Sequence, residues 1–97
     1  MAVYQLQNTS LSVNVNSMGA ELCSVVAADT TIEYIWQADP SVWARYAPNL
    51  FPVVGKLKND LYHYQSQSYE LAHNGIAMER GVVCMEETSH TLVFELS

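Results

Sequence analysis

The hexapeptide LSVNVN at residues 11–16 decides the fold class. Leu11, Val13 and Val15 alternate with polar residues, and this period of two places one face of a β-strand in an apolar interior and the other in water. An amphipathic helix would instead repeat its apolar residues every three or four positions. Residues 3–7 favour a partner strand across a turn-forming Asn-Thr-Ser tripeptide, so the chain opens with a predicted β-hairpin.

Short apolar runs continue along the chain at the spacing of an all-β protein. They are separated by residues that favour turns, among them Gly, Asp, Asn and Ser. No stretch has the periodicity and length of a helix beyond one turn, so we expect an all-β meander. The strands predicted after the first hairpin cover residues 20–28, 32–36, 61–64, 68–71, 82–85 and 91–96.

Two proline-containing segments depart from the strand pattern. Asp39 can cap a helix start and proline is favoured at the first helical position, so at most a single helical turn is expected between Pro40 and Ala44. Pro48 and Pro52 flank the next apolar triplet. Because proline cannot donate to a sheet ladder, this segment is predicted to be a pinned, extended loop or a sheet edge.

Length and composition indicate a chain with an incomplete core. With 97 residues it forms one domain, or part of a larger one. Apolar residues make up 49% and charged residues only 14%, against about 25% charged in typical domains. Either some of the surface is covered, or the exposed face is rich in Ser, Thr, Asn and Gln. The last predicted strand stops one residue before Ser97, so we expect a strand edge that something must cover.

The charge balance limits the partners. The formal net charge of −6 opposes the phosphate neutralisation on which nucleic-acid binding depends, so nucleic acid is excluded as a partner. A neutral ligand such as a sugar is compatible with this balance, although acidity does not select for it.

The cysteines and the N-terminus predict the compartment. Cys23 and Cys84 lie far apart, with no CxxC pair and no histidine at ligand spacing, so free thiols are expected and neither a metal nor another cofactor. The N-terminus has no basic region followed by an apolar one, and no apolar run is long enough to span a bilayer. We therefore expect a cytoplasmic, reducing location without a membrane partner.

Three stretches in a fixed order form a sequence pattern much longer than a single motif: GAELCSVVA at residues 19–27, the segment at 33–71, and HNGIAMERG at 73–81. Within the second, YIWQADPSVW at 34–43 precedes APNLFPVVG at 47–55, and this ordered pair is far more specific than one short motif. Together they resemble the LacX-like branch of the aldose 1-epimerase, or galactose mutarotase-like, family. Members are considerably longer, so the resemblance implies that residues 1–97 are a single domain or an N-terminal fragment of a large antiparallel β-sandwich.

The resemblance implies sugar chemistry on a concave face of that sandwich. In the family, a base removes the proton of the anomeric hydroxyl while an acid protonates the ring oxygen, and ring opening and reclosure interconvert the anomers. The glutamate base and the principal histidine acid of the family come from later sequence. No residue of this chain is therefore predicted to be catalytic, and the chain alone is expected to be inactive.

Three residues are predicted to contact the sugar. Lys56 stands where relatives have an arginine, which keeps the charge but loses the planar fork that can hold two hydroxyls. Asn74 stands at the position of a family histidine and can hydrogen-bond a hydroxyl but not act as an acid. His73 is one residue out of register. The alternatives are a solvated loop lysine at position 56 and a turn formed by Asn74 with Gly75.

Structural roles are expected for several other side chains. Arg45 is expected to pair with a carboxylate or clamp its loop, and Trp36 and Trp43 to anchor the core or loops. His63 is expected to be a half-exposed strand residue, and His90 to be solvated in a turn.

Three functions follow as hypotheses. The first is a truncated or fragmentary mutarotase-like protein, related to sugar chemistry by descent, with a hexose or a sugar phosphate as its ligand. The second is a free-standing, non-catalytic carbohydrate-binding module. The third is an assembly protein, in which exposed strand edges pair with a second copy to form a homo-oligomer.

Overall fold

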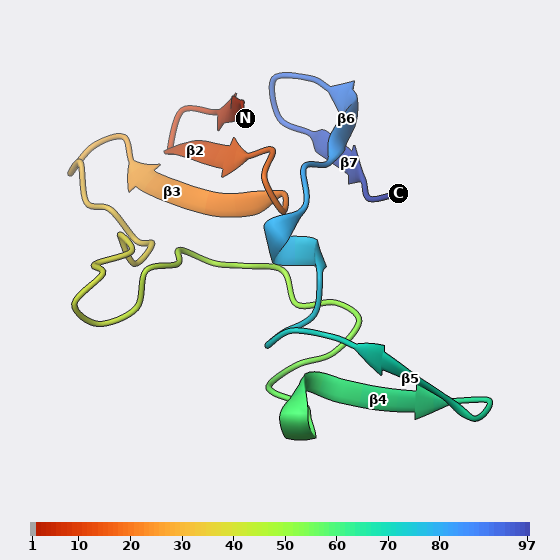
Figure 1. Ribbon diagram of the computed structural model, residues 1–97. Helices are drawn as coiled ribbons and strands as arrows, with labels where there is room; N and C mark the ends of the chain where they lie inside the picture. Colours follow the sequence, from red (N-terminus) through yellow and green to blue (C-terminus); the bar gives the residue numbers. More distant parts are fainter. Residues whose placement is uncertain (1) are drawn as a thin grey trace.

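The computed structural model describes residues 2–97 and is all-β, as the alternation in residues 11–16 predicts (Figure 1). One antiparallel sheet has the strand order β1-β2-β3, and two antiparallel hairpins are formed by β4 with β5 and by β6 with β7. The strands are β1 (Val3–Gln7), β2 (Leu11–Asn16), β3 (Glu21–Ala27), β4 (Leu61–Tyr64), β5 (Gln67–Glu70), β6 (Val83–Glu87) and β7 (Leu92–Glu95).

The described helical segments are short. Two 3₁₀ turns, η1 (Lys58–Asp60) and η2 (Ala77–Glu79), are not predicted by the sequence. Between Pro40 and Ala44 the chain makes a single turn, because the N–H groups of Val42 and Trp43 both donate to the Asp39 carbonyl, at 3.0 and 2.8 Å. Among residues 2–97 no helical segment therefore has the length and apolar character that a bilayer crossing needs.

The strand predicted over residues 32–36 is wrong. Only Glu33 forms a bridge there, to Val26 of β3. The Glu33 carboxylate accepts hydrogen bonds from the N–H groups of Val25 and Ile35, at 2.8 and 3.1 Å. Backbone donors near this edge of β3 are thus bound to a side chain, and pairing does not extend along a full strand.

The apolar face of the three-stranded sheet packs against the last hairpin. Leu6 of β1 and Val13 of β2 are direct cross-strand neighbours, so the aliphatic residues share one face. The ring of Tyr4 meets that of Phe94 from β7 in a T-shaped contact, with centroids 5.4 Å apart. The Gln7 N–H also donates to the Ser89 carbonyl at 3.2 Å. The β6–β7 hairpin therefore contacts β1 through both a side chain and the backbone.

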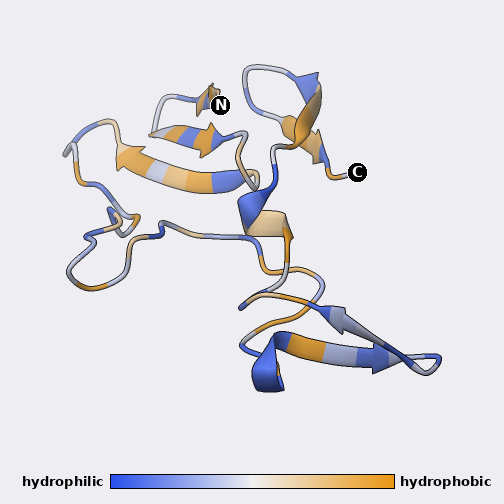
Figure 2. Cartoon of the chain, viewed as in Figure 1, coloured by the Kyte–Doolittle hydropathy of each residue, from blue (hydrophilic) through white to orange (hydrophobic). Residues whose placement is uncertain are grey.

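The interior of the described chain is thin. Its buried apolar side chains are Ala27, Leu71 and Ala77, and no side chain among residues 2–97 is completely enclosed. The radius of gyration is 16.2 Å, whereas a compact chain of this length has about 12.5 Å. Figure 2 shows hydrophobic residues in strands of all three sheets, and the β4–β5 hairpin lies well apart from the other two. Much apolar surface is therefore uncovered by the chain itself.

The hydrogen bonds of Glu33 predict that the stability of the fold depends on pH. The hydrogen bond from the Ser24 hydroxyl, followed by bonds from backbone N–H groups, lowers the pKa of Glu33. A depressed pKa contributes stability that is present above the unfolded-state pKa, about 4.3 for glutamate, and is lost as the pH falls through the folded-state value. We predict that the urea midpoint falls with acidification less steeply in Glu33→Gln than in the parent chain. The control Glu87→Gln, at an exposed β6 position, should follow the parent, and parallel curves for all three proteins would contradict the assignment.

Candidate functional site

The predicted sugar-binding residues lie on two loops that hydrogen bonds join. The Asn74 N–H donates to the Gly55 carbonyl at 2.8 Å, and the Gly55 N–H donates to the Asn74 side-chain oxygen at 2.7 Å. One asparagine thus binds both backbone groups of one glycine. The left-handed φ of +92° at Gly55 and of +64° at Asn74 gives each loop the bend that this pairing requires.

A second contact of the same loops lies at Phe51. Its carbonyl accepts hydrogen bonds from the N–H groups of Ile76 and Ala77, at 2.7 and 3.3 Å. Gly75 forms a parallel bridge with Phe51, and a Cβ at Gly75 would lie 2.1 Å from the Phe51 carbonyl oxygen. Only glycine permits this approach, because any side chain would overlap the backbone. We call the two contacts together, Gly55 with Asn74 and Phe51 with residues 75–77, the loop clasp.

Asn49 and Arg45 connect the clasp to the rest of the chain. The Asn49 amide donates to the carbonyls of Gly19 and Ala20, both at 2.9 Å, directly before β3. Arg45 pairs with Glu79 in η2, which confirms the expectation that Arg45 meets a carboxylate. Sequence reasoning missed Asn49, since its acceptors lie 29 and 30 residues earlier and leave no local signal.

The clasp brings the three predicted residues into one region. Lys56 follows Gly55 and His73 precedes Asn74, so the pairing places their backbones close together, and both side chains are exposed. Asn74 is only 8% exposed. Its oxygen is bound by Gly55, which leaves its NH₂ group as the part that can donate to a ligand. The turn expected for Asn74 with Gly75 also forms, because the Gly75 N–H donates to the Ala72 carbonyl.

The chemistry available here is hydrogen-bond donation. The Lys56 ammonium carries three donors, the Asn74 amide up to two, and the His73 ring a donor and an acceptor. Such groups suit the oxygens of a polyhydroxylated ligand. Among residues 2–97 no three His, Cys, Asp or Glu side chains are grouped to hold a metal ion. Cys23 and Cys84 are free thiols, and burial, followed by the nearby Glu21, raises the pKa of Cys23.

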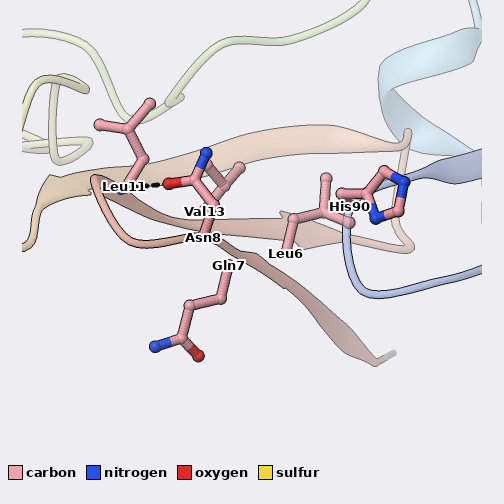
Figure 3. Close-up of a pocket in the computed structure, with 6 residues that line it drawn as sticks. All are labelled: Leu6, Gln7, Asn8, Leu11, Val13 and His90. Atoms are coloured by element: carbon pink, nitrogen blue, oxygen red, sulfur yellow. Dashed lines mark hydrogen bonds between the residues drawn. The ribbon is translucent and has the colours of Figure 1, made fainter.

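An apolar hollow lies away from these residues, between the β1–β2 hairpin and the β6–β7 turn (Figure 3). Its volume is about 170 Å³. The Asn8 side chain shapes it by accepting the Leu11 N–H at 2.8 Å. His90 is exposed in the turn between β6 and β7, as expected, and contributes to the wall of the hollow. The lining residues are Leu6, Gln7, Asn8, Leu11, Val13 and His90.

Substitution of two glycines tests the loop clasp. Gly75→Ala should lower the free energy of unfolding by about 2 kcal/mol, because φ is +81° and the new Cβ would strike Phe51. Gly81→Ala, where a Cβ meets nothing within 4 Å, should change it by less than about 0.5 kcal/mol. Urea titration measures both values, and hydrogen exchange of the Ile76 amide reports the clasp directly. Equal losses in the two variants would contradict the close approach.

Comparison with known proteins identifies relatives of much greater length. No protein family model matches the chain. It is 39% identical over 83 residues to the plasmid and chromosomal LacX proteins of Lactococcus lactis subsp. lactis, which covers 86% of this chain and 27% of LacX. The chain thus spans about a quarter of the length of the curated relatives that it matches.

Solved structures give the same result. A galactose mutarotase related enzyme from Lactobacillus acidophilus matches 98% of this chain with a TM-score of 0.96 and 39% identity, over 32% of its own length. A galactose mutarotase-like protein from Lactobacillus casei matches 96% with a TM-score of 0.92 and 28% identity, over 32% of its length. A putative aldose 1-epimerase from Escherichia coli K12, with a TM-score of 0.73 and 20% identity, shares the fold.

Proposed function

This chain is a homologue of LacX with the fold of part of a galactose mutarotase-like protein, and from that relationship we propose a function in carbohydrate binding. The observation that carries the proposal is the match to the galactose mutarotase related enzyme, at a TM-score of 0.96 and 39% identity over 98% of this chain. We propose that the corresponding reaction in full-length relatives is the interconversion of sugar anomers. We propose that this chain alone supplies binding groups and does not catalyse that reaction.

The proposed binding groups are Lys56, His73 and Asn74. The loop clasp supports this choice, since Lys56 and His73 each adjoin one of the two residues, Gly55 and Asn74, that two hydrogen bonds join. A loop backbone that is already held in place loses less conformational entropy when a ligand binds than a free loop does. The Asn74 amide does not titrate near neutral pH, so at this position the chain offers a hydrogen bond and not a proton.

The proposed ligand is a hexose or a sugar phosphate, met in the cytoplasm. The net charge of −6 is compatible with a neutral sugar, whereas the exposed ammonium of Lys56 would also attract a phosphate. A non-catalytic carbohydrate-binding module would use the same three residues in the same way.

A second candidate function is assembly. The chain exposes 6882 Å², whereas a compact monomer of this mass exposes about 5,500 Å². Within residues 2–97, β4 and β5 pair only with each other, so both outer edges of that hairpin can pair with a second copy. This candidate predicts a homo-oligomer joined through strand edges.

Titration with sugars tests the binding proposal. Chemical-shift changes on adding glucose, galactose and their 6-phosphates should be saturable and should include residues 55–57 and 73–74. Lys56→Ala should weaken binding about tenfold, because a hydrogen bond from a charged donor contributes about 1.5 kcal/mol. Lys58→Ala, two residues away and also exposed, is the matched control and should bind like the parent.

Polarimetry tests the second half of the proposal. With the parent chain, freshly dissolved α-glucose or α-galactose should mutarotate at the rate of buffer alone. Acceleration above buffer would refute the claim that the chain is inactive, while the absence of saturable binding for every sugar would refute the binding proposal itself.

A further inference from the structure

The loop clasp contains the one asparagine of the sequence that is followed by glycine, Asn74 before Gly75. Such a pair is prone to spontaneous deamidation, because glycine has no side chain to shield the backbone nitrogen next to the asparagine. After loss of its proton, the Gly75 nitrogen attacks Cγ of Asn74, the Cγ–Nδ2 bond breaks, and ammonia leaves with that proton. Water then opens the resulting succinimide ring at either carbonyl and gives aspartate or isoaspartate.

Hydrogen bonds of the folded chain engage both reacting groups. The Gly75 N–H, whose proton has to leave before the nitrogen can attack, donates to the Ala72 carbonyl at 2.8 Å. The Asn74 side-chain oxygen accepts the Gly55 N–H at 2.7 Å, which fixes the orientation of Cγ. Both hydrogen bonds have to break before the ring can close, so the folded arrangement opposes the reaction.

Ring closure also requires rotation of the backbone between Asn74 and Gly75. Gly75 lies so close to Phe51 that a Cβ would be 2.1 Å from the Phe51 carbonyl oxygen. The N–H groups of Ile76 and Ala77 donate to the same carbonyl and hold the next residues in place. The closed clasp therefore leaves the pair no space in which to rotate.

Burial adds to this protection. Asn74 is only 8% exposed, so the water that has to open the ring has little access to it. Each of the protecting contacts involves backbone groups or the Asn74 amide, and none depends on the uncovered apolar side chains of the molecule. The protection is thus a property of the clasp itself.

From these contacts we propose that Asn74 is a deamidation site controlled by the loop clasp, which suppresses the reaction when closed and permits it when it opens locally. Isoaspartate routes the backbone through Cβ and Cγ of residue 74, which lengthens the chain by one carbon atom. The tight approach of Gly75 to Phe51 has no room for the longer path, so a modified clasp does not close again. The reaction also removes the Asn74 NH₂ group, the donor that the proposed carbohydrate site would use.

Peptide mapping by mass spectrometry of the parent chain, in mildly alkaline buffer with and without guanidinium, tests the proposal. Asn74 should deamidate at least about tenfold more slowly in buffer than in the unfolded chain, because only the locally open fraction reacts. At guanidinium concentrations below the global transition, its rate should rise in parallel with hydrogen exchange of the Ile76 amide, which is bound within the clasp.

Two glycine variants isolate the contribution of the clasp. Gly55→Ala puts a side chain where φ is +92° and nothing lies within 4 Å, so it disfavours the bend of the clasp without a collision. It should accelerate deamidation of Asn74 about tenfold, in line with the strain of a left-handed residue. Gly81→Ala is the matched control, since its surroundings are equally open and its φ is not positive. Its rate should equal that of the parent.

Equal rates at Asn74 in buffer and in the unfolded chain would overturn the proposal. So would a Gly55→Ala rate no faster than that of the parent while the β2 amides stay protected, and if this variant unfolds altogether, the parallel rise in the parent decides. The isoaspartate product, isolated by chromatography, should exchange its Ile76 amide rapidly, and protection equal to that of the parent would refute the claim that a modified clasp stays open. No sugar is present in these measurements, so their outcome is independent of the carbohydrate proposal.

Discussion

The arrangement of this chain depends on the loop clasp. The interior is thin, and the hydrogen bonds that join Gly55 to Asn74 and Phe51 to residues 75–77 hold together the two segments that flank the β4–β5 hairpin. Asn49 and the bridge between Leu22 and Ala47 then connect this region to the three-stranded sheet. Backbone hydrogen bonds and the close approach of Gly75 to Phe51 therefore stabilise the arrangement of these segments, as side-chain packing does in a larger domain. The same contacts bring the backbones of Lys56 and His73 close together. The fold and the candidate site therefore depend on the same hydrogen bonds.

Local patterns account for what the sequence predicts correctly. The alternation over residues 11–16 can be recognised from neighbouring residues alone. The hairpins at 61–71 and 82–96 can be recognised from short turns between apolar runs. The failure at residues 32–36 has a different cause. The pattern there is that of a strand, but the Glu33 carboxylate binds backbone N–H groups of β3 and of its own segment, which no periodicity reveals. The clasp is likewise invisible, since its partners are about twenty residues apart.

The candidate site was foreseeable in its residues but not in its geometry. The resemblance to longer proteins selects Lys56, His73 and Asn74, and the Asn-Gly pair marks a turn. What it does not reveal is that Asn74 binds a backbone amide with its oxygen and so braces the loop at which it would meet a ligand. Whether these three residues contact a sugar stays a prediction, because such a contact depends on a ligand as well as on the fold.

The low charge content and the open surface both indicate that part of the surface of this chain is suited to being covered. Only 14% of the residues are charged, although a chain with so little interior would need a polar exterior to remain dispersed in water. The three-stranded sheet has an aromatic contact with β7, whereas in the β4–β5 hairpin Tyr62 and Tyr69 stack only on each other. Since the relatives are about three times longer, such surface in them has further chain to pack against.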